Sequence, residues 1–337
     1  MRRARKYLLW TLGALLLVLG AALLVVQRWV SGDEFRLRVE QEATAVLGVP
    51  LKLERVGLTL WPLPGVALDG VELRTRQPLK AERIELRPVW LHLLIGRVAI
   101  STLVVRRAVL PQQGIDALLV SLQKIRQRDK SPQTTSSLQL LPRRTVLDEL
   151  SWVDARGQAI VIQAEARLDG DALPERLELD VLRGRLQGAH LDLRRSDELA
   201  WEVLLRVAGG TVQGHVEVQP VGEAGAEFVL KGQLQTRDVE LSQLTAPEPT
   251  EAVRASQPLS GRLEASTTLN ARARQPSALL DLLQTQSKFT VRSGVLQGID
   301  LAKAVQTVGV SRGGKTPLDT LSGQVTTRGK AIELQNL

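Results

Sequence analysis

The sequence predicts a mainly β protein, in which an N-terminal transmembrane helix is followed by a mostly antiparallel β-sheet and a few short helices. Three observations predict this class. Residues 7–26 carry no charge, and most of the chain after residue 50 alternates apolar with polar residues. The apolar content is 44%, yet aromatic residues make up only 3%. Alternation with a period of two marks strands with one apolar and one polar face, and antiparallel sheets commonly leave one face in water.

The uncharged segment 7–26 is long enough to cross a membrane, because a helix of this length spans about 30 Å, the thickness of a hydrocarbon core. It is preceded by four basic residues, Arg2, Arg3, Arg5 and Lys6. The positive-inside rule therefore places the N-terminus in the cytoplasm and the remaining chain outside it. A cleaved signal peptide is the alternative, but its apolar region is normally about 7 to 15 residues long. We expect residues 1–30 to be a cytoplasmic tail and an uncleaved anchor.

The next segment is expected to form a helix, several strands and a second helix. Residues 33–47 have apolar side chains at helical spacing and end before Gly48, a common helix stop. The stretch LKLERVGLTLW then alternates, with a change of phase at Glu54-Arg55 that indicates a bulge. Alternation continues on both sides of Asp69-Gly70, a turn or bulge signal. Residues 114–127 have one apolar helical face.

The second half of the chain is expected to consist largely of strands. They run from 145 to about 242, with a hairpin at 155–157 and DVELSQL as the last strand. A linker over 245–258 follows, and the final part predicts strands with two helices, SALLDLLQ and IDLAKAVQTV. The apolar faces of these strands are aliphatic. They fit either an ordinary sandwich or a long curved sheet whose concave face is not filled by protein, and composition does not separate the two.

Composition argues against most kinds of catalytic or nucleic-acid site. The chain has no cysteine, and its three histidines (His92, His190 and His215) lie far apart. Metal and catalytic-triad chemistry is therefore not expected. Much of the net charge of +8 comes from the basic residues around the anchor. No basic run interleaved with aromatic residues is left, so we expect no nucleic-acid partner.

The stretch GVSRGGKT, residues 309–316, fits the phosphate-loop pattern and begins with a nucleophile-elbow pattern. A phosphate loop must follow a strand and open a helix, whereas here a predicted helix precedes the stretch and Pro317 follows it. An elbow needs a histidine downstream, and none follows Ser311. We expect a glycine-rich loop, no nucleotide, no cofactor and no enzyme activity.

Two stretches resemble AsmA-like proteins of Gram-negative envelopes. Residues 47–73, LGVPLKLERVGLTLWPLPGVALDGVEL, resemble the family's start: a short helix ending in Leu-Gly, a strand, a Pro-x-Pro-Gly break and a second strand. Residues 289–305, FTVRSGVLQGIDLAKAV, resemble its C-terminal signature, with Gly294, Gly298 and Asp300 in place. The chain is shorter than family members generally are and stops inside a predicted strand. It is therefore expected to be a truncated or unusually short member.

The resemblance implies a curved β-sheet groove with an apolar interior, held at the inner membrane with the bulk of the chain in the periplasm. It implies lipid binding or phospholipid transfer that contributes to outer-membrane lipid homeostasis and biogenesis. A structural or assembly factor that acts on outer-membrane proteins through exposed sheet edges is the alternative. The partners would be phospholipid, the inner membrane and envelope proteins. The expected segments are 31–128 and 245–337, both AsmA-like, with a central β region at 129–244. The candidate groove lining is Leu51, Leu53, Leu58, Leu60, Ile84 and Leu86.

Overall fold

A computed structural model describes eleven parts of the chain, and the strands dominate them. These parts are residues 32–59, 65–89, 100–128, 142–170, 173–221, 227–245, 259–274, 278–279, 281–298, 314–329 and 331–336. The contacts between residues divide the chain into two compact units, Met1–Gly157 and Gln158–Leu337. Each unit is described by itself.

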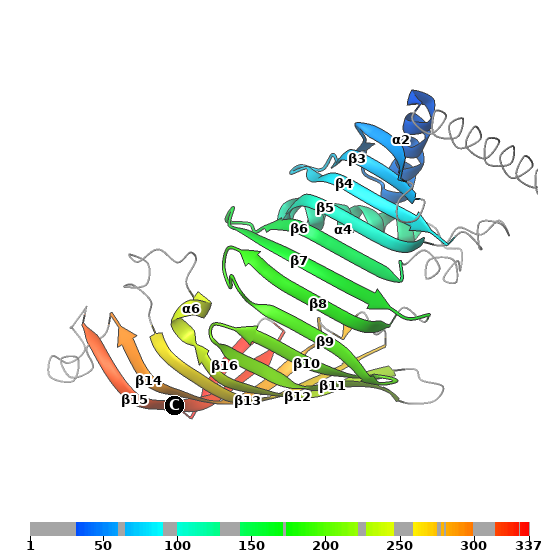
Figure 1. Ribbon diagram of the computed structural model, residues 1–337. Helices are drawn as coiled ribbons and strands as arrows, with labels where there is room; N and C mark the ends of the chain where they lie inside the picture. Colours follow the sequence, from blue (N-terminus) through cyan, green and yellow to red (C-terminus); the bar gives the residue numbers. More distant parts are fainter. Residues whose placement is uncertain are drawn as a thin grey trace, which may run out of the picture. The chain divides into compact units, whose positions relative to one another are not determined.

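The first unit is a β-sheet with two helices (Figure 1). The elements in chain order are α2 (Asp33–Leu47), β1 (Leu51–Lys52), β2 (Arg55–Thr59), β3 (Gly65–Leu73), β4 (Leu79–Pro88), β5 (Ile100–Pro111), α4 (Gln112–Arg128) and β6 (Arg144–Val153). Strand β3 pairs with both β1 and β2 on one side and with β4 on the other, and β5 and β6 follow. The predicted irregularity at Glu54-Arg55 is the break between β1 and β2.

Helix α2 protects the backbone of β1 at the edge of this sheet. The carboxylate of Glu40 accepts a hydrogen bond from the Leu53 amide at 2.8 Å, and the Thr44 hydroxyl accepts one from the Leu51 amide at 3.0 Å. Arg36 donates to the Leu53 carbonyl. Because an open strand edge is a template for pairing with other chains, these side chains block the edge at β1.

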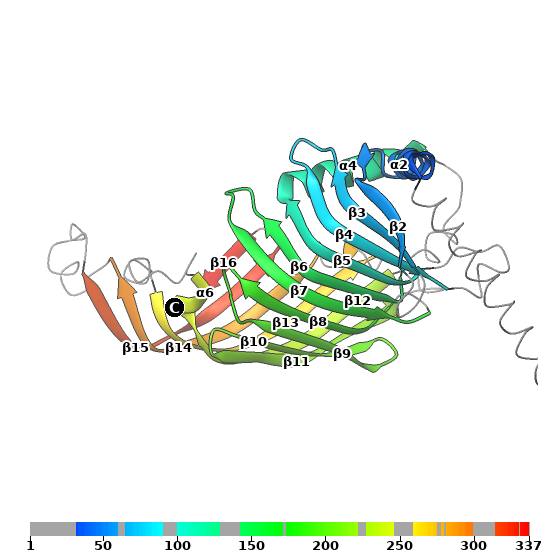
Figure 2. The same ribbon diagram turned by 45° about the horizontal axis from the view of Figure 1, so that its top comes forward.

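Helix α4 links two strands that run in the same direction. Strands β5 and β6 pair in parallel, and such a pair needs a long crossover between its strands. Helix α4 lies beside α2 at one end of the sheet (Figure 2). The hydroxyl of Ser121 in α4 donates to the Gly48 carbonyl, directly after α2, at 2.9 Å.

The second unit is a sheet whose strands lie side by side in chain order and pair antiparallel. They are β7 (Ala159–Leu168), β8 (Pro174–Arg183), β9 (His190–Asp197), β10 (Ala200–Val207), β11 (Gly210–Val221), β12 (Glu227–Glu240), β13 (Leu259–Ala273), β14 (Gln284–Gln297), β15 (Lys315–Arg328) and β16 (Ala331–Gln335). A short helix, α6 (Leu241–Thr245), follows β12. The sheet bends, and α6 lies on the inner side of the bend (Figure 1).

The mainly β character predicted from the sequence is confirmed, with two helices close to their expected bounds. The predicted anchor at 7–26 and the predicted helix IDLAKAVQTV lie outside the described residues. Among the residues that the structure does describe, no helix has both the length and the apolar character needed to cross a membrane. DVELSQL was expected to be wholly a strand, but Leu241–Thr245 is helical. The expected helix SALLDLLQ is not a regular α-helix in its described part: residue 278 is 3-10 helical, residues 279 and 281–282 form turns, and β14 begins at Gln284. The Leu282 amide donates a hydrogen bond to the Ala278 carbonyl at 3.3 Å.

Candidate functional site

The structure describes five of the six predicted groove residues and places them in two regions of the first unit. Leu51 and Leu53 are buried, with 8% and 4% of their surface exposed, where α2 lies along β1. Leu58, Ile84 and Leu86 are half-buried members of β2 and β4. Leu60 lies outside the described residues. The first pair therefore belongs to a closed core under a helix, and the other three are available to a larger apolar surface.

That larger surface, the N-terminal apolar face, crosses β2 to β5. Direct partners in paired strands share a face of the sheet. Leu58 is paired with Val66, which is paired with Leu86, and Leu86 is paired with Leu103. The neighbouring row consists of Val56, Leu68, Ile84 and Val105. Val56 is buried and the remaining members are half-buried.

Charged residues that alternate with Ile84 and Leu86 along β4 form a network of ion pairs. Glu85 is only 6% exposed. Its carboxylate lies 2.9 Å from Arg83, 3.6 Å from Arg87 and 3.5 Å from Arg106. A buried carboxylate needs such partners, because an unpaired buried charge is strongly destabilising. This network gives the first unit a polar side opposite its apolar rows.

The second unit has a wider apolar surface, the C-terminal apolar face. Its central row runs from Leu177 in β8 through Leu193, Val203, Gly214 and Leu234 in β12. A parallel row consists of Leu179, Leu191, Leu205 and Val212. All of these side chains are half-buried, so the described parts of the protein cover them incompletely. Contiguous apolar surface of this kind marks a place where another apolar partner binds.

Two short segments cover the ends of this face and leave its centre between them. Helix α6 places Leu244 in a cluster built on Ala189, Val207 and Val239. At the other end, Leu279 from the turn before β14 packs in a cluster with Leu230 and Ala271. The row through Val203 and Leu234 belongs to neither cluster. The C-terminal apolar face is thus a surface with packed ends and an open middle.

The central row carries hydroxyl groups in β13 and β14. Leu234 is paired with Thr267 in β13, and Thr267 with Ser287 in β14. The Thr267 and Ser287 hydroxyl oxygens lie 2.8 Å apart, in a hydrogen bond. Two residues from Ser287 along β14, the hydroxyls of Thr285 and Thr327 form a second such bond. We call these four residues the hydroxyl cluster.

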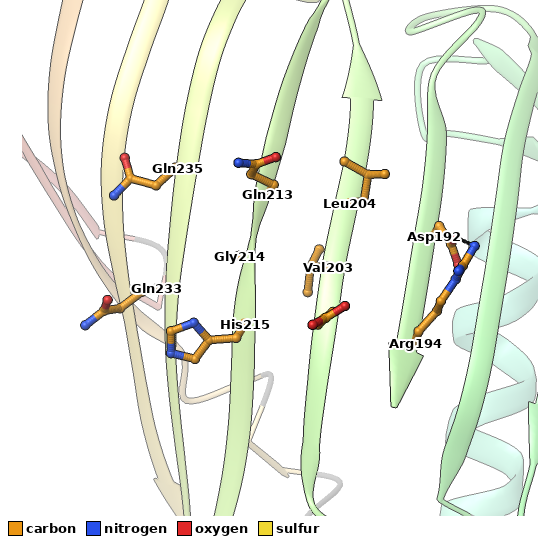
Figure 3. A pocket seen from close by; sticks show the side chains of 10 residues that line it. Asp192, Arg194, Val203, Leu204, Gln213, Gly214, His215, Gln233 and Gln235 are labelled. Carbon is orange, nitrogen blue, oxygen red and sulfur yellow. Dashed lines mark ion pairs between the residues drawn. The ribbon is translucent and has the colours of Figure 1, made fainter. Parts of the chain in front are cut away.

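The opposite face of the second unit is polar and contains a hollow of about 570 Å³ (Figure 3). Its lining side chains come from β9 to β12 and include Asp192, Arg194 and His215, with Gln213 and Gln233. The pKa of Asp192 is lowered, mainly by its hydrogen bond with Arg194, although burial acts in the other direction. Over the described residues, no group of three His, Asp or Glu side chains is placed to hold a metal ion.

Two of the six predicted groove residues, Leu51 and Leu53, are thus buried beside α2, and none of the six lies in the second unit. The change of phase at Glu54-Arg55 is what separates Leu53 from Leu58. A signal for the C-terminal apolar face was present in the sequence. LELDVL and HLDL alternate leucine with charged residues, and AWEVLLRV places aliphatic residues at the same spacing.

The glycine-rich stretch at 309–316 ends in a strand. Lys315 and Thr316 are the first residues of β15, which pairs with β14 through Lys315 and Gln297. The helix that a phosphate loop must open is therefore replaced by a strand at this position.

Comparison with known proteins finds a family match in the N-terminal part of the chain. No curated protein and no solved structure matches the sequence. The model of the AsmA family matches residues 1–140, which include α2, α4 and strands β1 to β5. The resemblance to AsmA-like proteins is thereby confirmed over residues 1–140 of this chain.

Proposed function

We propose that this is a lipid-binding and phospholipid-transfer protein of the cell envelope, which contributes to outer-membrane lipid homeostasis and biogenesis. In this proposal residues 7–26 anchor it in the inner membrane, with the N-terminus in the cytoplasm and the rest of the chain in the periplasm. The AsmA family is generally associated with the envelope. The proposal assigns no catalytic residue, cofactor or nucleotide.

The observation that carries the proposal is the half-buried C-terminal apolar face between α6 and the turn before β14. Full burial of a Leu or Val side chain contributes about 1.5 to 3 kcal/mol, so a broad half-buried face leaves much of that stabilisation unrealised. An acyl chain recovers it, at about 0.8 kcal/mol for each methylene that leaves water. Acyl chains need no fixed partners, which suits a face of Leu and Val with few polar atoms.

Photo-crosslinking in cells tests the proposal without detergent. A p-benzoylphenylalanine residue would replace Val203 on the C-terminal apolar face, with Leu193 as a second position and Gln213 as the control on the opposite face. We expect a phospholipid adduct at the first two positions and none at Gln213, as judged by mass spectrometry of the full chain. Absence of lipid at both Val203 and Leu193 would refute lipid binding there.

The second candidate function, an assembly factor that binds other envelope proteins, is favoured by one observation. All residues of strand β16 are exposed, and Ile332 and Leu334 expose 73% and 50% of their surface. An exposed edge strand can accept a strand from another protein. The same photoreactive residue at Ile332 distinguishes the candidates, because this function predicts a protein adduct at that position.

A further inference from the structure

The central row of the C-terminal apolar face changes from aliphatic to hydroxyl side chains at one place along its length. From β8 to β12 its central row carries Leu177, Leu193, Val203 and Leu234, with Gly214 between the last two. In β13 and β14 the same row carries Thr267 and Ser287, and it returns to apolar residues with Val325 in β15 and Leu334 in β16. Aliphatic surface therefore gives way to hydroxyl groups between β12 and β13.

Each hydrogen-bonded pair in the hydroxyl cluster retains binding capacity. A hydroxyl has one donor and can accept two hydrogen bonds. In the pair Thr267–Ser287 one hydroxyl donates to the other, which leaves one O–H group to donate elsewhere. The pair Thr285–Thr327 has the same property. Since both pairs lie on a half-buried face, a ligand with acceptor oxygens suits them better than a hydrocarbon chain does.

The dimensions fit one lipid lying across the strands. A hydrocarbon core is about 30 Å thick and consists of two leaflets, so one acyl chain extends about 15 Å. Neighbouring strands lie about 4.8 Å apart, so three strand spacings cover about 14 Å. A chain that begins over Thr267 in β13 would end over Val203 in β10, and the aliphatic row continues beyond that point to Leu177.

The charges on these strands indicate which part of the lipid is recognised. Lys231, Arg272 and Lys288 are paired with Asn270, Val229 and Ser266, at register positions of the opposite face. They cannot neutralise a phosphate held over the hydroxyl cluster. Neutral hydroxyl donors suit ester carbonyl oxygens, which are acceptors without charge.

We propose that the hydroxyl cluster Thr267, Ser287, Thr285 and Thr327 is a subsite for the glycerol-ester end of an acyl lipid, whose chains extend over Leu234 and Val203 toward β9. This rests on the proposed lipid binding and adds the orientation of the lipid to it. Because the donors are neutral, the subsite accepts zwitterionic and anionic phospholipids alike.

Two photoreactive phospholipids test the orientation on the full chain in vesicles. One probe carries a diazirine near the end of its acyl chain, and the other carries it beside the glycerol ester. Mapping of the adducts by mass spectrometry is expected to place the tail probe on β9 and β10 and the ester probe on β13 and β14. Exchange of a phosphocholine for a phosphoglycerol headgroup should leave both positions unchanged.

A double variant, Thr267→Val with Ser287→Val, removes one pair of hydroxyls at nearly constant volume. We expect at least a several-fold loss of ester-probe adducts on β13 and β14, while the tail probe still labels the protein. Thr268→Val, on the exposed opposite side of β13, is the matched control and should change neither yield.

The outcomes separate this proposal from the one on which it rests. If neither probe labels the wild-type protein above the level of a non-lipid diazirine, lipid binding itself fails. If both probes label β9 to β14 evenly, or the tail probe labels β13 and β14, lipid binding stands and the orientation is wrong. The wild-type map decides this even if the double variant does not fold.

Discussion

The indole Nε1 of Trp201 donates a hydrogen bond to the backbone carbonyl of Pro174 at 2.6 Å, which ties β10 to the first residue of β8. Trp201 is 6% exposed, and the guanidinium of Arg195 lies 5.8 Å from the centre of its ring. Arg195 in turn contacts Asp169 at 2.6 Å. The tryptophan thus combines a large buried surface with a satisfied donor, as buried tryptophans usually do.

The hydrogen bond and the buried ring of Trp201 predict different losses of stability for two substitutions of this residue. Trp201→Phe removes the donor and should lower the free energy of unfolding by about 1 to 3 kcal/mol, since the Pro174 carbonyl loses its partner. Trp201→Ala also leaves a cavity and should cost about 3 to 5 kcal/mol. Urea unfolding followed by circular dichroism measures both, with the exposed Lys231→Ala as control. Equal stability of Trp201→Phe and wild type would mean that the hydrogen bond contributes nothing.

The Asp192–Arg194 pair predicts how stability changes with acid. The pKa of Asp192 is lowered in the folded protein, first by its hydrogen bond with Arg194. A carboxyl with a lowered folded pKa stabilises the fold above its unfolded value, about 4, and this contribution is lost as the pH falls through the folded value. Asp192→Asn should therefore be less stable than wild type at pH 7, and the difference should shrink below about pH 4. A constant difference from pH 7 to pH 2 would contradict this.

Because Glu40 in α2 protects the edge of the sheet at β1, its two substitutions should lower the stability of the fold by different amounts. Glu40→Ala leaves the Leu53 amide without its acceptor and removes the ion pair of Arg36 with Glu40 at 3.1 Å, while the pair of Arg36 with Asp33 remains. A buried donor left unpaired costs about 1 to 3 kcal/mol, and the newly open edge should promote self-association. Glu40→Gln keeps an acceptor oxygen and should lose less. Analytical ultracentrifugation and thermal melting check both effects, with exposed Glu42→Ala on the same helix as control.

Local signals predicted the elements of the first unit well. Helix α2 runs from Asp33 to Leu47 as expected, and Gly48 ends it with φ 65°, a left-handed conformation that glycine adopts without strain. Alternation likewise identified β3 to β5. The parallel pairing of β5 with β6 was not predicted, because it joins residues about forty positions apart and depends on the crossover through α4.

Tertiary contacts explain the elements that were predicted wrongly. The strand pattern of DVELSQL ends at Glu240, whose carboxylate accepts hydrogen bonds from the Ser242 amide and hydroxyl and from the Gly261 amide. These contacts start α6, and Leu244 then joins the cluster around Val239. The pattern of apolar and polar residues in DVELSQL does not predict these contacts with distant residues. For the same reason alternation identifies which residues share a face but does not say whether a helix covers it, as Leu53 and Leu58 illustrate.

Lys315 is the first residue of the strand β15, so we expect that it does not bind a nucleotide. Lys315→Ala should leave the lipid adduct at Val203 unchanged, because the side chain is exposed and lies at the start of a strand rather than of a helix. Equilibrium binding of a fluorescent ATP analogue to the wild type should give no saturable signal. Saturable binding that Lys315→Ala abolishes would overturn this interpretation.

Leu58→Asp tests whether the N-terminal apolar face is a closed core or a lipid surface. Leu58 is half-buried and is paired with Val66, in a row with Leu86. If this row packed only against protein, the carboxylate would be buried without a partner, at a cost of several kcal/mol that would unfold the unit. If the row faces lipid, water reaches it when the lipid is absent, so the fold should survive while lipid binding falls. Thermal melting and phospholipid adducts at Leu86, measured on the same variant, give the two readouts.

Val109→Asp places the same charge on an apolar residue of β5 that is 42% exposed, and it should change neither the melting temperature nor the adduct yield. We expect a folded Leu58→Asp variant with reduced lipid adducts. Loss of the fold would indicate a closed core, and unchanged adducts would remove this face from the lipid path.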